Sequence, residues 1–146
     1  MSIIVAAMAL GIVAPEPRAG VAEPLAVKAR AAKTTVRRNK PFDVRVRVVN
    51  TSEEAQSFRV MNCSWDEHWK CSNPAVSWVS WDCSKNFPVT VTLKPGEAYE
   101  KTLPMLVTKG EPGARVSFKM GFTPIGSKGT YWSGKVTVRV EKAKPE

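Results

Sequence analysis

Residues 42–50 read FDVRVRVVN, and this stretch decides the fold class. Apolar side chains stand at positions 42, 44, 46 and 48, and charged side chains stand at positions 43, 45 and 47. Successive residues of a β-strand point to opposite faces of its sheet, so strict alternation is typical of a strand with one buried face. The sequence therefore predicts a half-buried strand over these residues.

Similar strand signals recur along the chain after residue 23. The further predicted strands are 25–31, 56–62, 89–93, 99–107, 116–122 and 132–140. Turn residues separate them, as in the run Lys94-Pro95-Gly96-Glu97, where proline fixes φ and glycine accepts the left-handed region. Pro104 has no backbone donor, which predicts that 99–107 is an edge strand.

These segments predict an all-β protein, an antiparallel immunoglobulin-like β-sandwich of seven or eight strands without an amphipathic helix. A small barrel is the alternative arrangement of the same strands. The length of 146 residues, with 43% hydrophobic and 24% charged residues, fits one folded domain. A single histidine and three cysteines exclude multi-histidine metal centres and large disulfide frameworks.

The N-terminal segment has the composition of a targeting signal. Residues 3–14 carry no charge, are too short to cross a bilayer as a helix, and suit the apolar region of a signal peptide. Small residues at Gly20 and Ala22 suit peptidase cleavage, although a basic leader is missing. We therefore expect a signal peptide over 1–22, a mature β-sandwich domain over 23–141 without a transmembrane span, and a polar tail over 142–146. The location would be periplasmic or extracellular; the alternative is a buried first element of a cytoplasmic protein.

Three motifs resemble the intracellular proteinase inhibitor (BsuPI) family in their order. They are NTSEEAQSFRV at 50–60, WVSWDCSKNF at 78–87 and VTLKPGEAYE at 91–100. The resemblance covers about Val44 to Tyr99, and it implies a sandwich fold, a binding role and proteinase inhibition. The chain departs from the family pattern by a cysteine-rich stretch and by two tryptophans, Trp78 and Trp81, in the second motif.

Residues 61–86, which we call the insert, break the strand alternation. The insert holds all three cysteines, the only histidine and four of the five tryptophans. Cys63 ends one predicted strand and Cys83 precedes the next, so a Cys63–Cys83 disulfide is expected in an oxidising compartment. Its closure would stabilise the fold by about 3 kcal/mol in the chain-entropy model. Cys71 would be left over, and another pairing or no disulfide remains open.

A soft-metal site is the alternative interpretation of the insert. Cys63, His68, Cys71 and Cys83, with Met61 nearby, offer thiolate, imidazole and thioether ligands for copper or zinc. Their spacing matches no zinc motif, and a blue-copper site needs two histidines. The main expectation is therefore a protein without a cofactor, with copper or zinc as the alternative.

Acid–base chemistry at Asp66, Glu67 and His68 is not the expected role of this run. A dyad of His68 with Cys63 or Ser64 can be drawn. Residues close in sequence rarely form such a pair, because strand side chains alternate between faces. A solvated polar loop is favoured, and a hydrolase is a minor alternative.

The tryptophans of the insert, Trp65, Trp69, Trp78 and Trp81, have two interpretations. Large aromatic side chains fill cores, and they also dominate binding hot spots. Four within one short segment exceed what one end of a sandwich core needs. We therefore expect at least one of them to be exposed as part of a binding surface.

The net charge is +9, and many of the basic residues recur at the same side of the predicted strands. Basic residues occupy outward positions on several predicted strands and would form one basic face if those strands shared a sheet. They are Arg45, Arg47, Arg59, Arg115, Lys119, Lys135 and Arg139. Such a face suits an anionic surface, although a solubilising role is the simpler interpretation. Nucleic acid is not expected, since no aromatic series is interleaved with these positions.

Taken together, the sequence predicts a secreted or periplasmic, non-enzymatic binding module. Its Cys/Trp/His-rich insert would be presented on a β-sandwich to a protein partner or an anionic surface. A copper- or zinc-binding periplasmic protein and a proteinase inhibitor are the alternatives.

Overall fold

The computed structural model describes residues 23–142, which form twelve strands and one short 3-10 helix, η1 (Trp65–His68). The predicted signal peptide over 1–22 and most of the predicted tail lie outside the described residues. Within residues 23–142, no helix has the length and apolarity needed to span a bilayer. The all-β prediction is confirmed.

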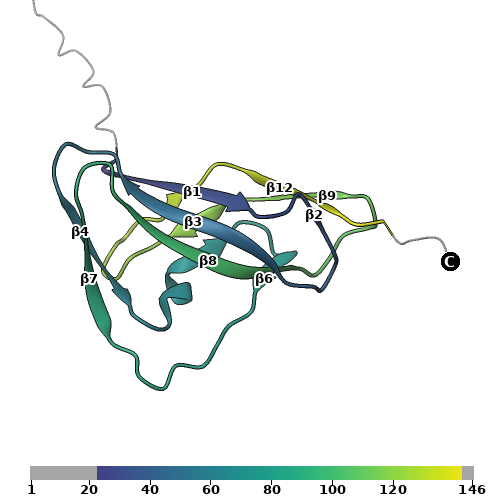
Figure 1. Cartoon of the computed structure of the whole chain (residues 1–146), viewed down its shortest axis with the longest axis horizontal. Helices are drawn as coiled ribbons and strands as arrows, with labels where there is room; N and C mark the ends of the chain where they lie inside the picture. Colours follow the sequence, from purple (N-terminus) through teal and green to yellow (C-terminus); the bar gives the residue numbers. More distant parts are fainter. Residues whose placement is uncertain (1–22, 143–146) are drawn as a thin grey trace, which may run out of the picture.

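The largest sheet is antiparallel, with the strand order β1-β3-β8-β6. Its strands are β1 (Leu25–Ala31), β3 (Phe42–Asn50), β8 (Ala98–Val107) and β6 (Val76–Trp78). The alternation that predicted β3 is confirmed, because Val44, Val46 and Val48 are fully buried and Arg45 is exposed. This sheet lies across the front of the molecule in Figure 1.

Three smaller sheets complete the fold. The first contains β2 (Thr35–Val36), β12 (Val136–Val140) and β9 (Arg115–Phe118). The second contains β11 (Tyr131–Trp132), β10 (Met120–Phe122) and β5 (Trp69–Cys71). The third pairs β4 (Gln56–Met61) with β7 (Pro88–Leu93). Pairing is antiparallel except between β2 and β12. None of the four sheets described between residues 23 and 142 closes on itself, so the barrel alternative is not observed.

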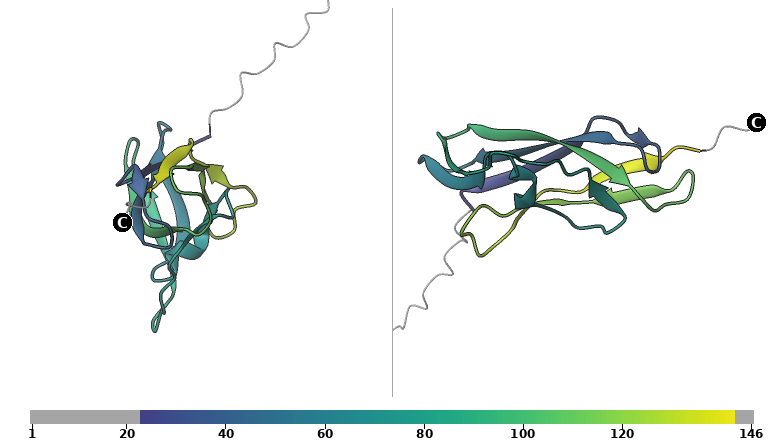
Figure 2. Two further views of the ribbon diagram at one scale, coloured as in Figure 1. Left: turned by 90° about the vertical axis from the view of Figure 1, so that its right-hand side faces the viewer. Right: turned by 90° about the horizontal axis from the view of Figure 1, so that it is seen from below.

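One hydrophobic core joins all four sheets. It contains Leu103 and Met105 of β8, Phe118 of β9 and Phe122 of β10, each 0–1% exposed. The two views of Figure 2 show the strands arranged around this core in an elongated molecule. Burial of this apolar surface supplies the main driving force for folding.

A buried asparagine fixes the turn after β3. Asn50 is 1% exposed, and its amide nitrogen donates to the carbonyl oxygens of Glu54 and Leu93 at 2.7 and 2.9 Å. Its side-chain oxygen accepts from the backbone nitrogen of Ser52 at 2.9 Å. Because each buried polar group finds a partner, the Asn-Thr-Ser turn is held against the start of the β7–β8 connection.

Pro104 does not mark an edge strand, and that prediction is wrong. β8 lies between β3 and β6, and Pro104 stands opposite Asp43. The Pro104 carbonyl accepts from the backbone nitrogen of Val79 at 3.0 Å, just beyond the end of β6. The nitrogen and carbonyl of one strand residue point to the same side of the strand, so the Pro104 nitrogen also faces this place beyond β6. Because the β6–β8 ladder has ended there, the N–H that proline lacks leaves no ladder hydrogen bond unmade.

The predicted strand over 116–122 is two strands in two sheets. β9 pairs with β12, whereas β10 pairs with β5 and β11. The chain changes partners at Lys119, whose backbone nitrogen donates to the Ser72 hydroxyl at 2.7 Å. The count of twelve strands exceeds the seven or eight expected, because such breaks and several strands of two or three residues add to the total.

Candidate functional site

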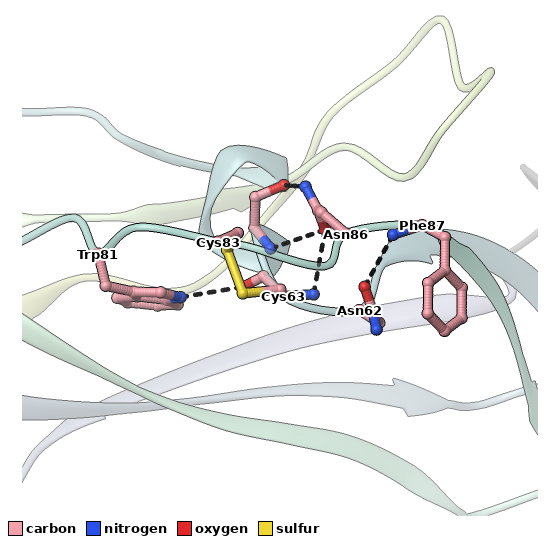
Figure 3. The surroundings of a disulfide bond; sticks show 7 residues. Asn62, Cys63, Trp81, Cys83, Asn86 and Phe87 are labelled. Carbon is pink, nitrogen blue, oxygen red and sulfur yellow. Dashed lines mark hydrogen bonds between the residues drawn. A yellow bond between two sulfur atoms is a disulfide. The ribbon is translucent and has the colours of Figure 1, made fainter.

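A disulfide bond joins Cys63 to Cys83, as the sequence predicts (Figure 3). The bonded residues are 20 positions apart, and their Cα atoms are 5.8 Å apart. Cys63 follows β4 and Cys83 precedes β7, and these two strands pair with each other. The bond therefore closes the excursion between two neighbouring strands at its base.

Asparagine side chains from both segments at the base of this loop brace it beside the bond (Figure 3). The Asn86 side-chain oxygen accepts from the backbone nitrogens of Cys63 and Ser64, each at 3.2 Å, and its amide donates to the Ser64 hydroxyl at 2.6 Å. The Asn62 side-chain oxygen accepts from the backbone nitrogen of Phe87 at 2.9 Å. Covalent and polar links thus hold the loop in one arrangement.

Aromatic side chains flank the disulfide; Trp81 and Phe87 are exposed, and Trp65 is half-buried. The Trp65 and Trp81 rings lie 5.0 Å apart, and the Trp81 indole donates to the Cys63 carbonyl at 3.0 Å. Val79, Trp81 and Phe87 are 43%, 36% and 56% exposed. We call Trp65, Val79, Trp81 and Phe87 the loop surface. Exposed large apolar side chains on a constrained loop have the character of a contact site.

A cation lies beside this surface. The Lys101 ammonium stands 5.2 Å from the Trp65 ring centre and 5.5 Å from that of Tyr99. Both distances are within the range of a cation–π interaction. Burial raises the pKa of Tyr99 to about 12, so its phenol stays neutral at physiological pH.

Trp69 belongs to the core, which corrects its predicted place in the binding surface. It is 2% exposed on β5, and its ring packs 4.9 Å from that of Phe122. Its indole nitrogen is buried without a hydrogen-bond partner. Trp78 is half-buried on β6, and its indole donates to the Asp66 carboxylate at 3.3 Å. Of the four predicted tryptophans, Trp81 is exposed, Trp65 and Trp78 are half-buried, and Trp69 is buried.

The polar residues of η1 have structural partners. Asp66 is 6% exposed and accepts from Trp78, as described above. His68 Nε2 accepts from the backbone nitrogen of Met61 at 2.9 Å. These contacts connect η1 to β4 and β6. Cys63, which the sequence offers as a dyad partner of His68, is bonded to Cys83 in the disulfide.

The structure does not bring the four predicted metal ligands together. Cys63 and Cys83 are bonded to each other, and His68 Nε2 is already an acceptor. Cys71 is a half-buried free cysteine on β5; burial raises the pKa of its thiol, and a hydrogen bond from the Asn73 backbone lowers it by less. Over residues 23–142 there is no group of three or more His, Cys, Asp or Glu placed to hold a metal ion.

The predicted basic face is divided among several sheets. Arg45 and Arg47 lie on β3, and Arg59 lies on β4. Arg115 and Arg139 stand opposite each other on β9 and β12. Lys119 lies between β9 and β10, and Lys135 precedes β12. The condition for one face, a shared sheet, is therefore not met.

Sequence reasoning missed two basic residues that do join Arg45 and Arg47. Lys28 and Arg30 of β1 stand directly opposite Arg47 and Arg45. The signal was present, because Lys28 and Arg30 have the same spacing as Arg45 and Arg47. Only the antiparallel pairing of β1 with β3 shows that the two pairs meet.

No protein-family model matches the chain, and no curated protein matches it either.

Proposed function

We propose that this chain is a non-enzymatic, exported binding module: an immunoglobulin-like β-sandwich that presents the loop surface to a protein partner. The observation that carries the proposal is the exposed Trp81 ring, 5.0 Å from the half-buried Trp65 ring beside the disulfide, with the exposed Phe87 just beyond the closed loop. Tryptophan and other aromatic residues are enriched among residues that dominate binding energy. A loop already held in one conformation loses less entropy on binding.

The disulfide supports the location outside the cytoplasm, because such bonds persist in oxidising compartments. The bracing by Asn62 and Asn86 supports a rigid recognition element. The sheets beneath it supply the scaffold, as in other sandwiches that carry their contact residues on loops.

The test compares capture of the partner by variants of matched folding. Crosslinking in the secreted fraction of the source cells is carried out with the unaltered protein, with a Trp81→Ala/Phe87→Ala variant and with a Trp132→Ala control, which removes an exposed tryptophan on β11. We expect one crosslinked protein with the unaltered chain and the control, and its loss with the loop variant at a similar thermal midpoint. Equal crosslinking by all three would contradict the proposal.

Proteinase inhibition, which the family resemblance implies, is a second candidate. The observation that favours it is the exposed, disulfide-closed segment around Val79 and Trp81. A rigid loop can occupy a proteinase cleft without productive cleavage. Inhibition of purified proteinases, lost in the Trp81→Ala/Phe87→Ala variant, would support this candidate, and rapid cleavage between Cys63 and Cys83 without inhibition would exclude it.

A further inference from the structure

The solvent face of the sheet β1-β3-β8-β6 brings four cations together. Lys28 stands directly opposite Arg47, and Arg30 stands directly opposite Arg45. The two pairs occupy successive positions on one face, so the four side chains form a two-by-two array. Like charges opposite each other destabilise a sheet, so folding alone does not explain this arrangement.

Carboxylates neutralise the array only in part. Glu100 lies 3.1 Å from Arg45 and 3.9 Å from Arg47, and it therefore serves both guanidinium groups. The Nε atom of Arg47 is buried without a hydrogen-bond partner. Neither Lys28 nor Arg30 forms an ion pair with any residue between 23 and 142. The exposed cations of Lys28 and Arg30 are therefore the donors that an anionic ligand would reach.

Shallow hollows follow these cations. One of about 410 Å³ is lined by Lys28, Arg30, Arg45, Arg47 and Glu100. A second, of about 260 Å³, shares Arg30 and Arg45 with the first and also contacts Asp43.

Further basic residues line a separate hollow at one end of the molecule. It measures about 580 Å³ and is lined by Lys33, Arg37 and Lys40, from the loops that follow β1 and precede β3, and by Glu141, which pairs with Arg37. These loops lie at the end of the molecule where β12 ends, on the right in Figure 1. We call the array and these end residues, namely Lys28, Arg30, Lys33, Arg37, Lys40, Arg45 and Arg47, the basic track.

We propose that the basic track binds a linear acidic polysaccharide through its carboxylate or sulfate groups. Guanidinium forks bind such planar or tetrahedral oxyanions with paired hydrogen bonds. The backbone positions that carry these cations are about 5 Å apart across strands and about 7 Å apart along them, a regular spacing that suits an extended chain with repeated charges. A single small anion would use only part of this surface.

Other polyanions fit the track less well. The track has no aromatic side chain for stacking nucleic-acid bases. Its rows on the sheet contain no long apolar side chain that would enter a bilayer, since Ala26, Val49 and Ala98 form the neighbouring row. This choice rests on the proposed export, which the disulfide supports, because polysaccharides are the more abundant polyanions outside the cell.

The decisive variant is Lys28→Glu/Arg30→Glu, because neither residue supports the fold through an ion pair. The control is Arg115→Glu/Lys119→Glu, which changes the net charge equally on exposed positions outside the track. Binding to heparin, which is sulfated, and to alginate, which is carboxylated, is measured by titration at several salt concentrations. Duplex DNA and phosphatidylglycerol vesicles serve as competing polyanions.

We expect salt-dependent binding of the unaltered protein to at least one of the polysaccharides, a loss of affinity of about tenfold or more in the track variant, and little loss in the control. The thermal midpoint of the track variant should be equal to or higher than that of the unaltered protein, because carboxylates would then oppose Arg47 and Arg45. Equal losses in both variants, undiminished binding by the track variant, absence of polysaccharide binding, or tighter binding to DNA or vesicles would overturn the proposal.

Discussion

Trp69 and Trp81 belong to the same insert but lie in opposite environments, with exposed fractions of 2% and 36%. Truncation of a buried aromatic side chain costs about 3–5 kcal/mol, since the core cannot refill the space. We expect Trp69→Ala to lower the free energy of unfolding by that amount. Trp81→Ala should cost about 1 kcal/mol or less, because it removes only a half-exposed ring and one hydrogen bond.

Denaturant unfolding of the two variants measures this difference. A large loss for Trp81→Ala would mean that the loop surface supports the core, and it would count against the proposed binding role. Similar small losses for both variants would contradict the burial of Trp69.

Tyr99 gives a prediction at alkaline pH. Burial raises its pKa in the folded protein from an ordinary value of 10.0 to about 12. A pKa that is higher in the folded state stabilises the fold fully below pH 10, and this contribution is lost as the pH rises towards 12. We expect the absorbance titration of tyrosinate to show a transition near pH 12 that is absent in Tyr99→Phe. A variant with the same high-pH transition would show that Tyr99 is not its source.

At the scale of elements, the disulfide carries the clearest energetic prediction. It closes an excursion of 20 positions between two paired strands. In the chain-entropy model such a bond stabilises the fold by about 3 kcal/mol, because it restricts the unfolded chain. We expect Cys63→Ser/Cys83→Ser to lower the free energy of unfolding by about that amount while β4 and β7 remain paired in the folded state.

Thiol counting gives an independent check on the bond. The unfolded, unreduced protein should react with one equivalent of thiol reagent, at Cys71, and the reduced protein should react with three. Three reactive thiols before reduction, in protein isolated under oxidising conditions, would show that the bond is absent.

Element prediction from this sequence succeeds where the alternation is long and one partner strand persists. β3 keeps one phase from Phe42 to Val48, so its buried face was evident. The break between β9 and β10 was not, because Val116, Phe118, Met120 and Phe122 keep the same phase while the pairing partners change. The phase of the alternation shows which face of a strand is buried, but it does not show which other strand pairs with it.

Prediction of the candidate site was limited in the same way. The Cys63–Cys83 bond was predictable, since both residues adjoin strands. The burial of Trp69 depends on pairing of the three-residue strand β5 with β10, which no local pattern indicates. The like-charged pairs of β1 and β3 likewise depend on register, which is a property of two strands together.

Across the whole molecule, charge is unevenly placed. The connections after β1 and before β3 carry Lys33, Arg37, Arg38 and Lys40. At the other ends of these strands stand Glu23, before β1, and Glu53 and Glu54, after β3; the adjoining β7–β8 turn carries both Glu97 and Lys94. The β3–β4 and β7–β8 connections lie at the opposite end of the long axis from the β2–β3 connection in Figure 1. Such a gradient orients an approaching polyanion towards the basic end and accelerates its encounter.

The same charge distribution predicts how stability responds to salt. Between residues 23 and 142, three like-charged pairs stand directly opposite each other: Lys28 with Arg47, Arg30 with Arg45, and Arg115 with Arg139. Salt screens exposed charges over a Debye length of about 8 Å at physiological ionic strength. The exposed ion pairs that salt also weakens, such as Arg37 with Glu141, contribute little. We therefore expect the thermal midpoint to rise from low to physiological salt.

The variant Arg30→Glu separates local repulsion from a general effect of net charge. It places a carboxylate opposite Arg45, so it should raise the free energy of unfolding at low salt by about 0.5–1 kcal/mol and reduce the rise with salt. Lys128→Glu, which makes the same change of charge on an exposed loop outside these pairs, should do neither to the same degree. A midpoint that falls with salt, or equal effects of both variants, would contradict repulsion at the array. If Arg30→Glu gains stability and loses polysaccharide binding, the repulsion between these cations is a cost to the free protein that the bound polysaccharide removes.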